Sequence, residues 1–410
     1  MSHWGGRGLG GDEVETGVGG LAFAQGWHSR ALVGPGWLAS LRLDGTARPV
    51  EGRSLRLITG YVEACQFLTD RRWSRAAARR EPIGPASAMS VTEMDPPRHT
   101  VIRGLLSHTF SPRSLEVMRS RLEHRAAEQL AVFVAPGPPA DLVGGFAAPF
   151  AFMVHCDLLG VPEHSRPVLY RWSLARAVDP DAGPHEIYAA EVGLHRAVTE
   201  VLDYLRRDPR EGLLGQLIAA RKRGVLTETE LRGVAASLFF DGHVLAAAQI
   251  ANALLCLLTH RDQLRGLRAD PAQLITAVEE MLRFSPSITV GMTRIATQQS
   301  HRRGTPAVGS AAATAVTFGL VNRDPTIFDD ANHFDITRTP NRHLSFGRGT
   351  HHCLGAYLMR LELDVAVTTL LNELPGLDLA VDERHLAWSA SRTIRSLHTL
   401  PLTWSTRNQT

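Results

Sequence analysis

Residues 346–355 read Phe-Gly-Arg-Gly-Thr-His-His-Cys-Leu-Gly, and this stretch is the most informative part of the 410-residue chain. Cys353 follows a loop with two glycines, at the start of a predicted helix whose apolar face carries Leu358 and Leu361. A thiolate in that place is stabilised by the helix dipole and by unpaired backbone N–H groups. It could act as a metal ligand, or as a nucleophile with His351 or His352, or it could be a buried structural cysteine.

The composition excludes several classes of protein. Lys and Arg number 44 and Asp and Glu 41, so the net charge of +3 is too small for a general nucleic-acid binder. The four cysteines are far apart in the sequence and form no C-x-x-C pair. We therefore expect neither a disulfide framework nor a zinc cage, and we predict a reduced, cytoplasmic setting.

No segment is predicted to enter a membrane. The first 20 residues lack the apolar core of a signal peptide, and residues 1–30 are predicted to be a flexible, glycine-rich terminus. The most apolar stretch, 234–258, contains Asp241, Gln249 and Asn252. It is therefore predicted to be a buried helix of a soluble protein.

The periodicity predicts a mainly α fold with a minor β region. Short strands are expected between 32 and 60 and again between 376 and 404, with strands and loops from 286 to 345. Thr227 and Glu230 form a capping box at the start of a helix of about 33 residues, nearly 50 Å long. The predicted helices are 61–69, 98–107, 113–133, 142–159, 164–178, 184–206, 212–221, 227–259, 271–283 and one from about 353.

The cysteine segment matches, at every fixed position, the F-G-x-G-x-H-x-C-x-G loop of the cytochrome P-450 monooxygenases. The chain resembles that family elsewhere too, from about residue 35 to 404. The further matching motifs are D-P-P-x-H-x-x-x-R at 95–103, E-x-x-R at 280–283, T-R at 293–294, N-R-D-P at 322–325 and the meander arginine Arg338. The order and spacing of these motifs make the resemblance specific.

The resemblance implies a fold and a cofactor. The fold is the triangular, mostly helical prism of that family, here one domain over residues 31–410. Haem b is expected between the long central helix and the cysteine-loop helix, with Cys353 as the thiolate ligand of its iron. Further expected haem contacts are His99, Arg103, Arg294, Phe346, Gly347, His351 and Gly355, of which the histidines and arginines bind propionates. Glu280, Arg283 and Arg338 are expected to form a structural ion cluster behind the loop.

The resemblance also implies separate redox partners. Soluble bacterial members take electrons from NAD(P)H through a reductase and a ferredoxin, and no flavin or iron–sulfur motif occurs in this chain. We predict a monomer without nucleic-acid or membrane partners. Five arginines are expected to form a basic docking face for an acidic ferredoxin, namely Arg71, Arg72, Arg103, Arg113 and Arg348.

The long helix departs from the family pattern. The motif A-G-x-[D/E]-T becomes Asp241-Gly242-His243-Val244-Leu245, so the acid–alcohol pair that manages proton delivery is missing. We treat Asp241, Gly242, Val244 and Leu245 as the candidate catalytic segment. A substrate group could deliver the proton, or Asp241 could, one helical turn before Leu245. Alternatively, the reaction is unusual, such as an oxidative coupling, or the protein is a non-catalytic helper.

Substrate walls follow from the resemblance alone. They are the loop 83–93, helices around 170–192, the centre of the long helix, the residues Ile288, Thr289 and Val290, and the pair Thr393 and Ile394. The predicted function is that of a haem-thiolate oxidase or monooxygenase in bacterial natural-product tailoring, acting on a small-molecule or carrier- or peptide-bound intermediate. The alternative is a non-catalytic partner or activator of another biosynthetic enzyme.

Overall fold

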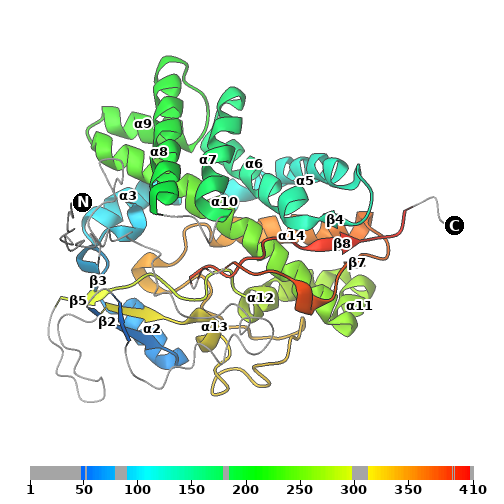
Figure 1. Ribbon diagram of the computed structural model, residues 1–410. Coiled ribbons are helices and arrows are strands. Elements are labelled where there is room, and N and C mark those ends of the chain that lie inside the picture. The colour runs from blue at the N-terminus through cyan, green and yellow to red at the C-terminus, as the bar shows by residue number, and fades with distance from the viewer. Residues whose placement is uncertain are drawn as a thin grey trace, which may run out of the picture.

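The computed structural model describes residues 48–50, 53–78, 90–178, 184–297, 313–389, 391 and 393–406. The glycine-rich segment 1–30 and positions 83–89 of the predicted substrate loop lie outside these residues. Helices dominate the described chain, and three small sheets lie at its margins (Figure 1). The predicted mainly α class with a minor β region is confirmed. One domain over 31–410 remains a prediction.

The long helix α10, Glu228–Thr259, crosses the middle of the molecule (Figure 1). Thr227 and Glu230 form the predicted capping box at its start. The helix packs most extensively on α6 (Ala148–Leu159) and also on α8 (Pro184–Arg207) and α14 (Ala356–Glu373). It is long and apolar enough to cross a membrane, but 78% of its apolar window is buried inside the protein, as in a core helix.

Two apolar cores meet along α10. Its first part, up to Phe240, packs into a core shared with α3, α7, α8 and α9, and its last part, from Ala246, packs into a core shared with α5, α12 and α14. Residues 241–245 belong to the buried set of neither core. The candidate catalytic segment therefore adds no buried apolar side chain to either core, although His243 within it is buried and Val244 packs on the first core.

Most helix bounds agree closely with the predicted ranges. α2 and α3 coincide with them, and α7, α8, α9 and α10 differ by at most two residues at an end. The bounds are α2 Tyr61–Thr69, α3 Arg98–Ser107, α7 Arg166–Val178, α9 Leu213–Lys222 and the short α13 Phe318–Val321.

Four predicted helices need correction. The range 113–133 breaks into α4, Pro112–Glu116, and α5, Arg119–Val134, because the Met118 N–H bonds back three residues to the Leu115 carbonyl. The range 142–159 begins as a π-turn, Val143–Ala147, and the helix predicted at 271–283 is α12, Leu274–Phe284, after a 3₁₀ turn. The helix expected from about 353 begins at Ala356.

Two helices were not predicted: α11 and the four-residue α13, which lies in the range predicted as strands and loops. α11, Arg261–Ala269, buries only Leu264 and Leu267, so its apolar repeat is too short to register beside its charged residues.

The strands are short and form three small sheets at the edges of the helical part of the molecule. β1 (Arg48–Val50) pairs antiparallel with β2 (Arg53–Ile58), which runs parallel to β6 (Ala313–Val316). β3 (Trp73–Ser74) pairs with β5 (Ile295–Ala296). The third sheet has the order β4 (Ala140–Asp141), β8 (Pro401–Thr403) and β7 (Asp378–Leu379).

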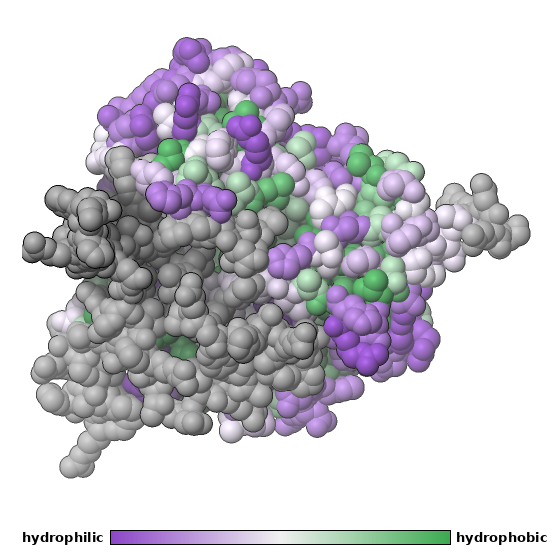
Figure 2. Space-filling model, in the orientation of Figure 1, coloured by the Kyte–Doolittle hydropathy of each residue, from purple (hydrophilic) through white to green (hydrophobic). Residues whose placement is uncertain are grey.

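On the face shown in Figure 2, apolar residues form small separate groups among hydrophilic ones, most plainly over the helices at the top. The most exposed apolar side chains are also scattered. Val117, between α4 and α5, and Ile275, on α12, are each 80% exposed. Surfaces of this kind are ordinary for a water-soluble domain.

Candidate functional site

Cys353 lies between the cysteine loop and α14, three residues before that helix begins. Its backbone N–H donates to the Phe346 carbonyl at 2.8 Å, which closes the loop on itself. Burial among protein atoms raises the pKa of the thiol, although the residue is exposed to solvent-sized probes. A side chain that is both accessible and desolvated faces an enclosed space.

Four groups act on the same thiol, and they do not all act in the same direction. The Gly355 N–H and the Arg103 and Arg360 guanidiniums lower its pKa, and Asp241 raises it. The Gly355 N–H therefore stabilises the thiolate, as the sequence predicts. Without a bound group, however, desolvation has the larger effect and raises the pKa of the thiol. Binding to a metal ion would reverse that balance, because a coordinated thiol is deprotonated.

The loop glycines have separate reasons to be glycine. Gly347 and Gly349 have φ of 66° and 75°, a conformation that favours glycine. A Cβ on Gly349 would also lie 2.7 Å from the Leu68 carbonyl oxygen of α2. By contrast, a Cβ on Gly355 would meet no atom within 4 Å. The first two glycines shape the loop and its fit to α2, and Gly355 faces open space.

Predicted propionate residues come from three distant segments and meet beside this loop. His99 and Arg103 lie one turn apart on α3, and the His99 ring is 4.3 Å from the His351 ring, centroid to centroid. Arg103 donates to the His352 carbonyl at 2.6 Å. Arg294, which is 3% exposed, donates to the Phe67 and Leu68 carbonyls at 3.3 and 3.1 Å.

This group of side chains carries positive charge, and within the described part of the chain Asp95 acts on it only electrostatically. Burial together with Arg75, His99, Arg294 and Arg103 lowers the pKa of His351 to about 2. Burial and then Arg103 and Arg75 also lower the pKa of His99. Buried nitrogen atoms without a hydrogen-bond partner among the described residues are Arg75 Nε, His99 Nδ1, and Arg294 Nε and Nη2.

A dianionic group would satisfy these donors, since buried cations require a partner. The two propionates of a haem have that charge, and the thiol of Cys353 lies close enough for Arg103 to affect its pKa. The residues present therefore fit the haem that the sequence predicts. Arg75 was missed by the sequence analysis, because no motif marks it.

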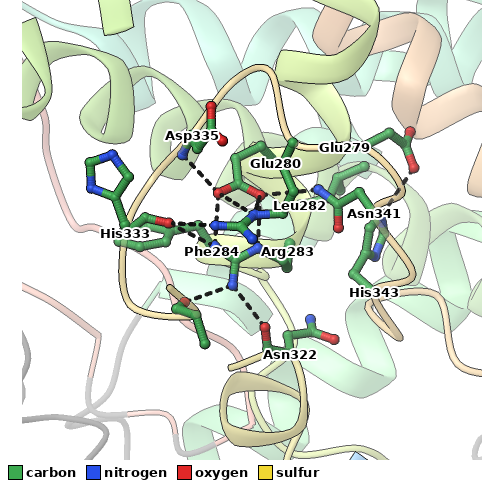
Figure 3. Close-up of polar contacts among 12 residues, drawn as sticks. Glu279, Glu280, Leu282, Arg283, Phe284, Asn322, His333, Asp335, Asn341 and His343 are labelled. Atoms are coloured by element: carbon green, nitrogen blue, oxygen red, sulfur yellow. Dashed lines mark hydrogen bonds and ion pairs between the residues drawn. The ribbon is translucent and has the colours of Figure 1, made fainter. Parts of the chain in front are cut away.

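A buried ion cluster lies behind the loop (Figure 3). Arg283 donates to both carboxylate oxygens of Glu280 at 2.7 Å, and both residues are fully buried. Arg338 Nε lies 3.2 Å from the same carboxylate. Arg283 also donates to backbone carbonyls of three residues, Asn322, Ala331 and His333. The structure thus brings the three predicted members together and ties α12 to the segment before the cysteine loop.

A second ion pair supports the loop directly. The Arg360 guanidinium of α14 binds both oxygens of Glu279 at 2.6 and 2.8 Å and lies 4.6 Å from the centre of the Phe346 ring. His343 Nε2 is 3.1 Å from the same carboxylate. Despite burial, Arg360 and His343 hold the pKa of Glu279 down at about 2. Sequence reasoning missed these contacts.

The candidate catalytic segment has two sides. Asp241 is exposed and influences the Cys353 thiol, and Val244 and Leu245 are half-buried, so the segment faces the cysteine. Gly242 lies on another side, where a Cβ would come within 2.1 Å of His155 Nε2 on α6. The predicted catalytic role of Gly242 is therefore better replaced by a packing role.

Two buried histidines accompany that contact. His243 Nδ1 is 2.7 Å from the Phe239 carbonyl, so it donates there, and Nε2 accepts from the Ser173 hydroxyl at 2.7 Å. Burial lowers the pKa of His243 to about 3 and that of His155 to about 4. Both imidazoles are neutral packing groups at physiological pH.

The predicted substrate wall is partly rearranged. Ile288 and Ile394 form an antiparallel bridge, and the Thr289 N–H donates to the Thr393 carbonyl at 2.9 Å, so the two segments lie side by side as predicted. Thr289 and Val290 are each 5% exposed. Their side chains join protein contacts, which leaves Ile288, Thr393 and Ile394 as the half-buried candidates.

Known proteins resemble this chain over nearly its whole length. Residues 193–375 match the family described as cytochrome P450. The mycinamicin IV hydroxylase/epoxidase of Micromonospora griseorubida is 35% identical over 92% of this chain and 96% of its own length. The nocardicin C N-oxygenase of Nocardia uniformis subsp. tsuyamanensis is 37% identical over 90% of this chain and 95% of its own length. The solved structure of the P450 monooxygenase TamI with tirandamycin C bound has a TM-score of 0.84 and 33% identity, and covers 92% of this chain and 99% of its own.

Proposed function

The chain belongs to the cytochrome P450 family of oxidoreductases, and we propose that it oxidises a small-molecule or carrier-bound intermediate of bacterial natural-product biosynthesis with a haem held by Cys353. The family implies the haem and electrons supplied by a reductase. Its similar members include a mycinamicin IV hydroxylase/epoxidase and a nocardicin C N-oxygenase, and neither they nor the geometry favour a non-catalytic helper.

One observation carries the proposal. The desolvated, accessible thiol of Cys353 lies beside a buried group of cationic side chains that includes nitrogen atoms without a hydrogen-bond partner among the described residues. When bound, the haem would supply thiolate-assisted cleavage of the O–O bond. His99, Arg103, Arg294 and His351 would hold the propionates, and the Glu280–Arg283–Arg338 cluster would keep the loop in place.

The absorption spectrum of the reduced, CO-treated protein tests this proposal. Thiolate ligation gives a red-shifted Soret band, and Cys353→Ala should lose that band while the protein stays folded. The buried Cys256 offers a matched control, because Cys256→Ala should retain the band. A haem-supplemented wild-type protein that binds no haem would overturn the proposal.

Proton delivery is the part of the reaction in which this chain departs from its family. The usual acid and alcohol positions hold Val244 and Leu245, which have no proton to give. Asp241 is the carboxylate of this segment that influences the cysteine thiol. We therefore assign proton management to Asp241 or to a polar group of the substrate itself.

The proposed electron donor is a ferredoxin reduced by NAD(P)H through its reductase. α2 packs on the turn of the cysteine loop, and α4 packs on α14, so arginines on these elements lie next to the cysteine side. Arg71, Arg113 and Arg348 are exposed there. Arg72 is instead paired with Asp70, and Arg103 donates to the His352 carbonyl, which removes these two from the predicted docking face.

A further inference from the structure

Arg75 has a buried guanidinium whose hydrogen-bonding capacity is mostly unused. It follows β3, and its Nη1 donates to the Thr92 carbonyl at 3.3 Å. Its Nε is buried and has no acceptor among the residues that the structure describes. An arginine presents five N–H donors, so a single long bond to a carbonyl leaves the charge unpaired.

Asp95 acts on the Arg75 guanidinium electrostatically but forms no ion pair with it. Asp95 accepts from the Ser74 hydroxyl and from the backbone N–H groups of Arg75 and Ala76, so it is occupied as a turn cap. Asp95 and Glu93 act on the Arg75 guanidinium only at longer range, and burial lowers the Arg75 pKa to about 9. The side chain remains in place without a direct ion pair among the described residues.

The groups around Arg75 are themselves cationic or hydrogen-bond donors. Arg294 repels it, and Arg75 is the first charged group that acts on His351, ahead of His99 and Arg294. Arg75, Arg103 and Arg294 thus place three guanidiniums around His99 and His351. Two carboxylates of a bound group would leave an excess of one positive charge.

We propose that Arg75 binds a haem propionate directly and links it, through the Thr92 carbonyl, to the segment that precedes α3. This inference rests on the proposed function, because it requires that the chain hold haem. Arg75 is then a cofactor-binding residue in addition to those that the family motifs predict.

The link to Thr92 gives the contact a second consequence. Thr92 lies in a 3₁₀ turn, Val91–Glu93, whose capping box of Ser90 and Glu93 stiffens it. That turn is the described end of the predicted substrate loop 83–93. The Arg75 guanidinium would therefore hold both a propionate and the turn Val91–Glu93 of the predicted substrate loop. Removing it should weaken the binding of haem and of substrate together.

Haem transfer from the purified holoprotein to excess apomyoglobin tests the inference, with Arg75→Gln, Arg75→Lys and the exposed Arg71→Gln compared with wild type. Loss of a hydrogen bond to a charged group should speed haem loss by roughly tenfold or more in Arg75→Gln. Arg75→Lys keeps the cation, so its rate of haem loss should lie between those of wild type and Arg75→Gln. Arg71→Gln should match wild type.

The midpoint potential of the same proteins provides an independent readout. A nearby cation favours the reduced state, so Arg75→Gln should shift the potential downward and Arg75→Lys should leave it close to wild type. If Arg75 only held the Thr92 carbonyl in place, the midpoint potential would not depend on the charge at position 75 in this way. If wild type holds haem but Arg75→Gln changes neither haem loss nor potential, this inference is wrong. If wild type holds no haem, the proposed function itself fails.

Discussion

Asp241 is the carboxylate of the candidate catalytic segment, and its role determines how the proposed reaction obtains protons. Its carboxylate is exposed on the side of α10 that faces Cys353, and Val244 and Leu245 follow within one turn. Two roles are open to such a group. It can pass protons to the reaction, or it can pair with a cationic group of the substrate.

Asp241→Asn separates these two roles, because it keeps size and hydrogen bonding but removes charge and acidity. A proton-managing Asp241 predicts unchanged substrate affinity, slower turnover and more reduced oxygen released as hydrogen peroxide. A substrate-pairing Asp241 predicts weaker binding by about 1.5–3 kcal/mol. Titration of the substrate-binding spectrum and the ratio of peroxide formed to NAD(P)H consumed distinguish them. If neither quantity changes, substrate-assisted proton delivery becomes the remaining account.

Glu279 is a residue whose ionisation should stabilise the fold. Arg360 and His343 hold its folded-state pKa at about 2, below an unfolded value of roughly 4.3. The stabilisation is therefore complete above that unfolded value and is lost as the pH falls toward 2. Allowing for partial solvent screening, it amounts to about 2 kcal/mol.

Denaturant unfolding of Glu279→Gln at pH 7 and at pH 3 measures this contribution. The variant should be less stable than wild type at pH 7, and the difference should narrow at pH 3. Exposed Glu123 supplies the control substitution, Glu123→Gln. A deficit of equal size at both pH values would show that Glu279 stabilises by packing alone.

At the scale of the elements, the contact of α6 with α10 fixes the position of the catalytic segment. Gly242 is needed because a Cβ there would lie 2.1 Å from His155 Nε2 and 2.3 Å from its Cδ2, both on a buried ring. This packing sets the rotation of α10, and that rotation turns Asp241 toward the cysteine.

A double-mutant cycle tests the contact. Gly242→Ala should destabilise the protein by about 1–3 kcal/mol through overpacking, despite the better helix propensity of alanine. His155→Ala opens the space, so the double variant should recover most of that loss. Thermal or denaturant unfolding of the four proteins gives the coupling energy. Strictly additive effects would mean that the two elements do not meet at this point.

Helices with a long apolar repeat were the predictable elements. α2, α3 and α10 could be placed from their apolar spacing, and the capping box of Thr227 and Glu230 located the start of α10. α11 buries only two leucines, so its repeat is too short to detect. The break at Met118 depends on one backbone hydrogen bond, from the Met118 N–H to the Leu115 carbonyl, and no side-chain pattern predicts it.

The site was predictable only where a motif fixes spacing. His99, Arg294 and His351 could be grouped because family motifs mark each, and the structure brings them together. Arg75, Glu279 and Arg360 carry no such mark, and their proximity to the loop arises from tertiary packing. Val290 was predicted as a substrate-wall residue from the family resemblance, and in the structure its side chain is buried against Leu55.

In the whole molecule, Asp241 of α10 lies near enough to the cysteine loop to act on the Cys353 thiol, and cationic side chains are exposed on that loop and on the elements beside it. Arg348 lies in the loop, Arg71 follows α2, and Arg113 lies on α4, which packs on α14. All three are exposed, so an acidic ferredoxin could approach the cysteine side with its charge complementary to theirs. Electron transfer should then depend on ionic strength.

Stopped-flow reduction by an acidic ferredoxin measures this dependence. The rate should fall as salt rises, because exposed charges are screened within about 8–10 Å near physiological ionic strength. The double charge reversal Arg113→Glu with Arg348→Glu should slow reduction at low salt by roughly tenfold and flatten the salt dependence. Arg196→Glu on α8 is the control, since Arg196 is 81% exposed on a helix that packs on α7, α9 and α10. A rate that ignores salt, or equal slowing by Arg196→Glu, would place the docking surface elsewhere on the molecule.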